Sequence, residues 1–432
     1  MDVPGFVLAI IERLHAAGFQ AYVVGGAVRD VCLNRPVTDW DVTTSASPVE
    51  IRRVFHDTGN FFLKHETVTL VNTACHYEVT TLRGDGNRVP AIEDDLAHRD
   101  FTINAMAYEI DGKVILDPYG GREDIHRRLV RAVGDPNGRF NEDPLRLLRA
   151  VRIAVELGFE IERGTMECIS GMANQLASVA QERIRDELVK ILLSSRPSRG
   201  FSIMRRTGLL KQILPELLEG FRKKQNKYHH YTIFRHIMET VDRVEPEPVL
   251  RLAALLHDIA KPRVRRRIKG EFRFFGHEKE SAVLAREIME RLRFSNDMIK
   301  QVTDLIGLHM IGYDRKWSDG AVRRLIRRAG PENIDRLLSF RKADLMAHGL
   351  IDEKLDLLDE LEKRVGELRD NRFVKNRNNL AVDGKIVMEI LGLPAGPEVG
   401  NVLGELMERV TDHPELNNEK RLIELLEEML PG

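Results

Sequence analysis

The chain has 432 residues, of which 43% are hydrophobic and 31% charged, and its formal net charge is −1. This composition is typical of a folded protein with about two to four domains, and it excludes a chain that is disordered or basic throughout. Any surface that binds nucleic acid would have to be a local patch.

The cysteines and the hydropathy indicate a cytoplasmic protein. Cys32, Cys75 and Cys168 form no CxxC pair, which argues against a zinc knuckle or a disulfide framework. The N-terminal segment is amphipathic and does not have the pattern of a signal peptide. We expect no membrane span, because the chain contains no apolar run of about 18 residues.

The first 125 or so residues alternate between helix and strand patterns. Residues 5–18 have helical spacing of apolar side chains and end at Gly18, a typical C-cap. AYVVGG predicts a buried strand with a tight turn, and a short helix follows it. VTDWDV predicts a second strand, SPVEIRRV a capped helix, and TVTLVNT with HYEVTTLR an antiparallel hairpin. We expect an α+β fold around a small mixed sheet.

Strand patterns largely disappear from about residue 140. EDPLRLLRAVRIAVELGF, QERIRDELVKILLS and RGFSIMRRTGLLKQILPELL all have helical period, and the rest of the chain is mostly helical in pattern. Breaks rich in Pro, Gly or polar residues fall near 215–228, 262–271, 312–320 and 372–385.

Two carboxylates within the second predicted strand are the first candidates for chemistry. Side chains of a strand alternate between its faces, so Asp39 and Asp41 would point the same way. Like charges at this spacing repel each other unless they are solvated or share a cation. The pair therefore lies on a solvated edge or holds a divalent metal.

The residues before this strand favour the metal. Gly25 and Gly26 let a backbone approach a phosphate, and Arg29 can add a charge-assisted contact. Mg²⁺ is commonly held by a few carboxylates together with substrate phosphates. The ordered combination indicates metal-assisted phosphoryl or nucleotidyl transfer.

VGGAVRD…DWDV resembles the head of the class II tRNA nucleotidyltransferases, the superfamily of CCA-adding enzymes and bacterial poly(A) polymerases. The resemblance implies that Asp39 and Asp41 hold Mg²⁺ and align the primer 3′-OH. HYEVTTLR resembles the strand with the third carboxylate, which is Glu78. HRDFTINAMAY resembles the family's RRDFTINA motif, with His98 in place of its first arginine. The nucleotide-binding residues carried over from these motifs are Gly25, Gly26, Arg29, Arg99, Asp100 and Asn104.

A row of polar residues in EDPLRLLRAVR predicts a base-reading site. Asp143, Arg146, Arg149 and Arg152 are spaced by three, so neighbours are close on a helix although the row spirals. An acceptor beside a planar donor fork can hydrogen-bond the edge of a base. The resemblance implies that Asp143 and Arg146 select the incoming CTP or ATP, with Arg149 and Arg152 toward the triphosphate. The alternative is an ordinary salt-bridged helix face.

The segment between Arg83 and Asp94 is short, with the ten residues GDGNRVPAIE at 84–93. In the resembled family, full CCA-adding enzymes carry a longer loop here that serves the switch from CTP to ATP. The short segment therefore implies an enzyme that adds the two cytidines and stops. Asp85 and Arg88 acting in a shorter loop would instead allow full CCA addition.

Two further functions stay as alternatives. A poly(A) polymerase usually carries a strongly basic extension, whereas the C-terminal LIELLEEMLPG is acidic. An RNA-binding scaffold with an inactive head would be expected to have a broken DxD motif, whereas this one is intact.

The second half of the chain has histidines in an order that resembles an HD phosphohydrolase domain. Imidazole and carboxylate groups are ligands for divalent transition metals, and such a metal can activate water against a phosphoester. The alternative is a degenerate HD fold that serves as a scaffold. The candidate ligands are His236, His257, Asp258, His277 and His309.

We expect four domains and an RNA partner. The fold class is an α+β nucleotidyltransferase head at 1–139, then a mainly α-helical neck at 140–222, an HD domain at 223–320 and a body and tail at 321–432. Basic runs at 263–270 and 319–330 are either solvated faces or contacts to a polyanion. The expected partners are tRNA, CTP and, for the alternative function, ATP.

Overall fold

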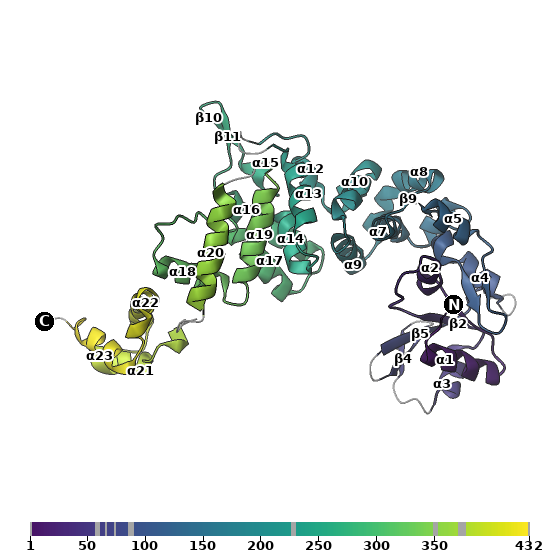
Figure 1. The fold of residues 1–432 in the computed structure, drawn as a ribbon, viewed down its shortest axis with the longest axis horizontal. Coiled ribbons are helices and arrows are strands. Elements are labelled where there is room, and N and C mark those ends of the chain that lie inside the picture. Colours follow the sequence, from purple (N-terminus) through teal and green to yellow (C-terminus); the bar gives the residue numbers. More distant parts are fainter. Residues whose placement is uncertain are drawn as a thin grey trace. The chain divides into compact units, whose positions relative to one another are not determined.

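The computed structural model describes residues 2–56, 61–64, 67–72, 75–84, 90–225, 230–348, 353–369 and 377–430. The chain divides into two compact units, residues 1–213 and 214–432 (Figure 1). The first contains a mixed sheet and its helices, and the second is almost entirely helical. The predicted fold class is confirmed.

The sheet of the first unit has the strand order β3-β4-β5-β2-β1-β6-β7. Strands β2 and β5 pair in parallel, while the other neighbouring pairs are antiparallel. The predicted hairpin is confirmed as β4 and β5, whereas β3 was not predicted. The strands are β1 (Ala21–Val24), β2 (Asp41–Thr44), β3 (Phe61–Lys64), β4 (Thr67–Asn72), β5 (Cys75–Thr81), β6 (Ala107–Glu109) and β7 (Val114–Leu116).

Local signals explain where the helices of this sheet domain begin and end. Ser47 and Glu50 form a capping box at the start of α3, as SPVE predicts. The first helix ends just before Gly18, whose φ of +86° suits glycine. The helices are α1 (Gly5–Ala16), α2 (Gly26–Cys32), α3 (Pro48–Val54), α4 (Ile92–Ala97) and α5 (Gly121–Arg127).

Strand β2 is shorter than the sequence predicts, because it begins at Asp41 and leaves Asp39 outside it. Its register with β1 pairs Asp41 with Val24. The chain turns into α2 directly after Val24, so β1 offers no residue to pair with Asp39. Asp39 is exposed, and the prediction that it lies within the same strand as Asp41 is wrong.

Six further helices and a small strand pair complete the described part of the first unit. Helix α7 ends at Gly158, which has the left-handed conformation expected of a C-cap. Strands β8 and β9 pair in parallel. The elements are β8 (Leu129–Val130), α6 (Pro136–Glu142), α7 (Arg146–Leu157), β9 (Glu160–Ile161), α8 (Arg163–Met172), α9 (Gln181–Leu192), α10 (Pro197–Thr207) and α11 (Leu209–Ile213), with short 3-10 turns at Thr102–Asn104 and Ala173–Ser178.

The second unit is helical apart from one hairpin. Strands β10 (Arg266–Ile268) and β11 (Glu271–Arg273) occupy a segment predicted only as a break. The helices are α12 (Pro215–Glu219), α13 (Ile233–Arg243), α14 (Pro248–Leu256), α15 (Lys261–Val264), α16 (His277–Arg291), α17 (Asn296–Leu308), α18 (Asp319–Ala329), α19 (Ile334–Met346), α20 (Glu353–Arg369), α21 (Gly384–Leu391), α22 (Pro397–Asp412) and α23 (Glu419–Glu427), with short 3-10 turns at Arg377–Asn379 and Pro414–Leu416.

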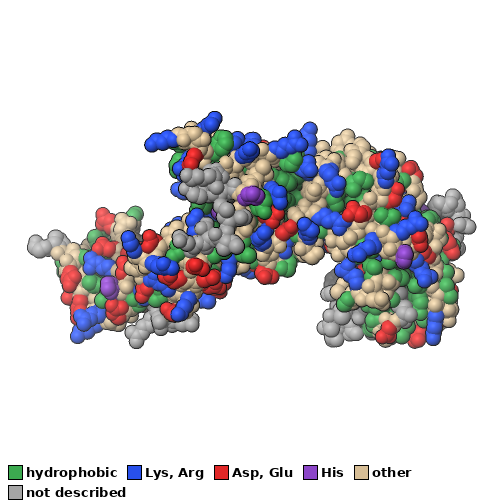
Figure 2. Space-filling view, turned by 45° about the horizontal axis from the view of Figure 1, so that its top comes forward, with side chains coloured by type: hydrophobic (Ala, Val, Ile, Leu, Met, Phe, Trp, Pro, Cys, Tyr) green, Lys and Arg blue, Asp and Glu red, His purple; other side chains and the backbone are tan. Residues whose placement is uncertain are grey.

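The two predicted basic runs differ in their surroundings. Side chains of Lys and Arg gather on the β10–β11 hairpin, where Arg266, Arg267 and Lys269 are exposed (Figure 2). The arginines of α18 instead contact α22: Arg324 pairs with Asp412 at 2.9 Å, and Arg327 with Glu408. The second run therefore stabilises the packing of α18 on α22.

Helices α21 to α23 enclose a small core of their own, which includes Val387, Leu406 and Leu422. Among the described helices, none combines the length and the apolar character needed to cross a membrane.

Candidate functional site

A glycine turn forms one wall of the candidate site in the first unit. Gly25 has a φ of +73° and stands at the N-cap of α2. A Cβ at this position would lie 2.7 Å from Arg99 Nη1 and 3.5 Å from Asp41 Oδ2. Only glycine therefore leaves room for the arginine and the carboxylate to approach the turn together.

The carboxylates that the structure brings together here are Asp41 and Glu78, which face each other in the register of β2 and β5. Burial raises the pKa of Asp41, Arg99 opposes this, and Glu78 and Asp39 raise the pKa further. A half-buried carboxylate with carboxylate neighbours is a donor set that could hold a hard divalent cation. Asp39 lies close enough to influence Asp41, although it does not line the cavity.

Asp41 and Glu78 open onto a cavity of about 390 Å³. Its polar lining fits a nucleoside triphosphate better than an apolar ligand, because arginine and carboxylate side chains converge on it. The lining residues are Gly25, Gly26, Asp41, Glu78, Thr80, Arg83, Asp95, His98, Arg99, Asp100, Asn104, Asp143, Arg146 and Arg149.

Arg29 is held by neighbours and is absent from this lining. Its Nε and Nη2 each donate to Asp30 at 3.0 Å, and its Nη1 donates to Asn104 Oδ1 at 2.7 Å. In this arrangement Arg29 braces the start of α2 against the HRDFTINA segment.

Asp100 is the buried centre of a polar network in the wall of the cavity. It accepts from Arg149 at 2.6 Å and 2.9 Å and from Asn104 Nδ2 at 3.0 Å. Burial alone would raise the pKa of Asp100, but Arg149 and the hydrogen bonds from Asn104 and Phe101 outweigh it and lower the pKa. Asp100 therefore stays ionised and fixes Arg149.

Asp143 is not on the same helix as the three arginines, which corrects the predicted spiral row. It adopts an extended conformation, with φ −147° and ψ 98°, between α6 and α7. The cause is Pro144, because a proline disfavours the helical conformation of the residue before it. Asp143 accepts from Arg183 at 2.8 Å and 3.1 Å. Our grouping of Asp143 with Arg146 as a pair on one helix is therefore wrong.

The arginines of α7 have separate partners. Arg146 donates to the carbonyl of His98 at 2.8 Å and to Glu142 at 2.9 Å. Arg152 pairs with buried Glu187 at 2.6 Å and with Glu156 at 3.0 Å, and it does not line the cavity. Asp143, Arg146 and Arg149 nevertheless line the same cavity as Asp41.

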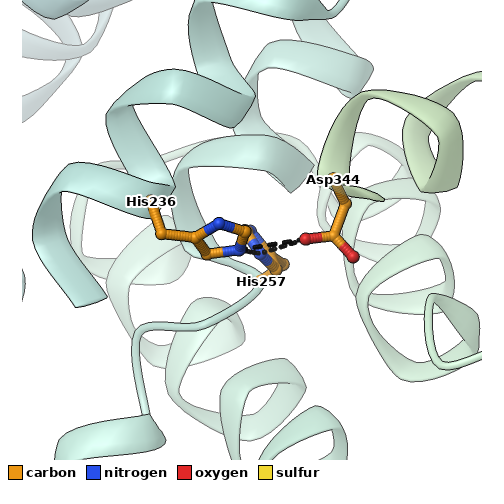
Figure 3. A group of neighbouring side chains, drawn as sticks. All are labelled: His236, His257 and Asp344. Carbon is orange, nitrogen blue, oxygen red and sulfur yellow. Dashed lines mark hydrogen bonds and ion pairs between the residues drawn. The ribbon is translucent and has the colours of Figure 1, made fainter. Parts of the chain in front are cut away.

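A second cluster lies in the helical unit, where His236 of α13, His257 after α14 and Asp344 of α19 meet (Figure 3). The Nε2 atoms of the two histidines are 3.2 Å apart, and Asp344 Oδ1 lies 3.0 Å and 3.4 Å from them. Asp344 was not predicted, because an aspartate within a helical segment carries no ligand signal until the fold places it beside the histidines.

The other three predicted ligands, Asp258, His277 and His309, form a neighbouring buried group. Asp258 Oδ1 and His277 Nε2 lie 3.4 Å apart, and neither has a hydrogen-bond partner among the described residues. Orphaned buried polar atoms are costly unless a ligand satisfies them. The donor set of imidazoles and carboxylates fits a divalent transition metal.

His257 belongs to the first group, and its charge balances the carboxylates of both groups, Asp344 and Asp258. Burial lowers the pKa of His257, but Asp258 and Asp344 reverse the effect and raise it to about 9. Burial and the neighbouring His257 together lower the pKa of His309 to about 3. A proton on His257 thus offsets the carboxylates where a bound cation would otherwise do so.

The chain matches three family models in order. They are the poly(A) polymerase head domain at residues 21–131, the probable RNA and SrmB-binding site of polymerase A at 158–220, and the HD domain at 228–349. The HD match runs past residue 320, where we expected that domain to end, and it includes Asp344. This order of matches defines a nucleotidyltransferase of the poly(A) polymerase class with an HD domain.

The CCA-adding enzyme of Lactobacillus gasseri is 32% identical over 97% of this chain and 96% of its own length. A CC-adding tRNA nucleotidyltransferase of Halalkalibacterium halodurans is 45% identical over 202 residues, which are 47% of this chain and 52% of that protein. The Bacillus stearothermophilus CCA-adding enzyme in complex with CTP has a TM-score of 0.74 and 29% identity, covering 99% and 98% of the two chains. The chain therefore belongs to the CCA-adding enzyme family and is a tRNA nucleotidyltransferase.

Replacing Asp41 should separate activity from stability. We expect Asp41→Asn to lower nucleotide addition by more than the roughly 10- to 100-fold typical of outer-shell residues. Because burial raises the pKa of Asp41, its charge opposes folding at neutral pH, so the melting temperature should not fall. Asp111→Asn, which changes an exposed carboxylate that does not line the cavity, is the control. Activity close to wild type in Asp41→Asn would contradict this assignment.

The Asp100–Arg149 pair should make stability depend on acid pH. The lowered pKa of Asp100 means that its contribution is fully present above the unfolded pKa, near 4, and is lost as the pH falls through the lower folded value. We expect Asp100→Asn to cost about 2 kcal/mol in urea unfolding at pH 7 and to flatten the loss of stability below pH 4. Glu167→Gln, from an exposed ion pair, should leave the free energy of unfolding close to that of the wild type. Equal effects of the two variants would refute the role of burial.

Proposed function

We propose that this enzyme adds cytidines to the 3′ end of tRNA from CTP and stops after two. The observation that carries the proposal is the segment 84–93, which is only ten residues long, whereas the resemblance implies a longer loop here in full CCA-adding enzymes. Residues 85–89, with Asp85 and Arg88, lie outside the described residues. The 45% identity to a CC-adding relative supports the proposal over about half of the chain.

The cavity suits this chemistry. Asp41 and Glu78, with Asp39 from the adjoining segment, would hold Mg²⁺, which supplies charge neutralisation at the triphosphate and activation of the primer 3′-OH. The guanidinium of Arg99 and the backbone at Gly25 and Gly26 would bind the phosphates.

Other residues that line the cavity would select the base. Asp143 and Arg146 offer an acceptor and a donor fork for the edge of cytosine. Arg149, fixed by Asp100, would face the triphosphate. The contacts of Arg29 and Arg152 suit bracing roles, with Arg29 joined to Asn104 and Arg152 to Glu187.

Full CCA addition is the second candidate, because the relatives that match nearly the whole chain are named CCA-adding enzymes. The partners would then include ATP as well as tRNA and CTP. The exposed arginines and lysine of the β10–β11 hairpin suit contact with tRNA phosphates, and the cytoplasm is the expected compartment.

The number of added nucleotides decides between the two candidates. Transcripts that end at the discriminator base, after C and after CC would be incubated with Mg²⁺ and CTP, ATP or both, and read at single-nucleotide resolution. We expect growth to stop after two cytidines, because the base-reading site lacks the long loop that serves the switch. Addition of A to the CC-ended transcript would refute CC-only addition, while no addition of C would refute both candidates.

For the helical unit we propose a metal-dependent phosphohydrolase activity. It is supported by two adjoining groups of buried imidazole and carboxylate ligands, and by Lys261, whose Nζ lies 2.6 Å from Asp258 Oδ2. Such a lysine would offer charge to a phosphate, and a metal held by these ligands would supply activation of water.

Metal loading tests this second activity. After chelation and reloading with Ni²⁺, Mn²⁺ or Co²⁺, the protein should retain metal and melt at a higher temperature, because the ions bind only the folded state. His257→Ala should lose the retained metal and hydrolysis of a model phosphodiester but keep nucleotide addition. The exposed histidine variant His413→Ala is the control. If the protein retains metal but hydrolyses nothing, the proposed phosphohydrolase activity is refuted and the metal site is structural. If it retains no metal, the metal site itself is refuted.

A further inference from the structure

Asp95 is a buried carboxylate beside the cavity that no motif of the sequence singled out. It lies on α4 and its relative exposure is only 3%. Its Oδ2 accepts from Nε and Nη2 of Arg99 at 3.2 Å and 3.1 Å. Its Oδ1 accepts from the backbone N–H of Arg83 at 3.3 Å, just beyond the end of β5. One side chain thus links the arginine to the strand that carries Glu78.

These contacts fix how Arg99 approaches the site. Asp95 engages Nε and Nη2, and the remaining Nη1 lies over Gly25. Asp41 Oδ2 borders the same glycine, 3.5 Å from where its Cβ would be. An arginine in water samples many rotamers, and holding it in one orientation removes an entropy cost from the reaction.

We propose that Asp95 is a positioning residue for nucleotidyl transfer. It holds the Arg99 guanidinium over Gly25 beside Asp41, and it ties this arginine to the end of β5. The inference rests on the proposed phosphate-binding role of Arg99. Asp95 touches no substrate in this scheme and acts through the arginine. Its loss lets the guanidinium leave the position where the triphosphate binds, so turnover falls more than CTP binding does.

The test compares two aspartates that are adjacent on α4. Asp95→Asn keeps the shape but removes the charge, and we expect it to lower kcat for C addition at least about 10-fold, with a smaller change in KM for CTP. Asp94→Asn is the matched control, because the Asp94 carboxylate accepts from the Ala91 N–H at 2.9 Å and does not line the cavity. It should leave kcat close to wild type.

A double-mutant cycle with Arg99→Gln shows whether Asp95 acts through the arginine. In the Arg99→Gln background, Asp95→Asn should cost no further activity, because the partner that it positions is gone. The double variant has neither charge of the Asp95–Arg99 pair, so it leaves no charged partner unpaired. Comparing it with Arg99→Gln therefore tests the inference even if Asp95→Asn alone folds poorly.

Two outcomes would overturn the inference: Asp95→Asn behaving like Asp94→Asn, or the same loss of activity with and without Arg99. If the wild-type enzyme itself adds no nucleotide, the proposed function is refuted. This outcome is distinct from a failure of the inference about Asp95.

Discussion

The first unit depends on one ion pair, between buried Asp100 and half-buried Arg149. Asp100 belongs to the segment that follows α4, while Arg149 is on α7, so the pair joins the sheet and its helices to α7. Asn104 extends the network to Arg29 of α2. A charge buried this deeply must be paired, and the pairing fixes how the helix meets the sheet. The cavity lies where these elements converge.

Much of this arrangement could be predicted from residue patterns. Alternating apolar residues gave β4 and β5, the Ser-Pro-x-Glu signal gave α3, and the paired glycines gave the turn before α2. These features are local, so a single sequence contains the information that specifies them. The resemblance of the motifs to the nucleotidyltransferase family, rather than a local pattern, led to Asp41, Glu78 and the arginines at 99, 146 and 149, which line one cavity.

The errors came from effects that act between segments. Asp39 fell outside β2 because β1 turns away, and Asp143 left its expected helix because Pro144 follows it. Asp344 and Asp95 carry no pattern of their own; each gains a role only when another element is packed against it. The β10–β11 hairpin was missed because it is short and made largely of charged residues, which have low strand propensity.

The proline after Asp143 has a consequence for how specificity evolves. Pro144 keeps Asp143 outside both flanking helices, and the Asp143 carboxylate accepts from the backbone N–H of Leu145 at 3.2 Å and from Arg183. If Asp143 reads the base, as we propose, a substitution there would change the group that faces the nucleotide and would also remove a contact at the start of α7. A change of nucleotide specificity at this position would therefore require a compensating contact elsewhere.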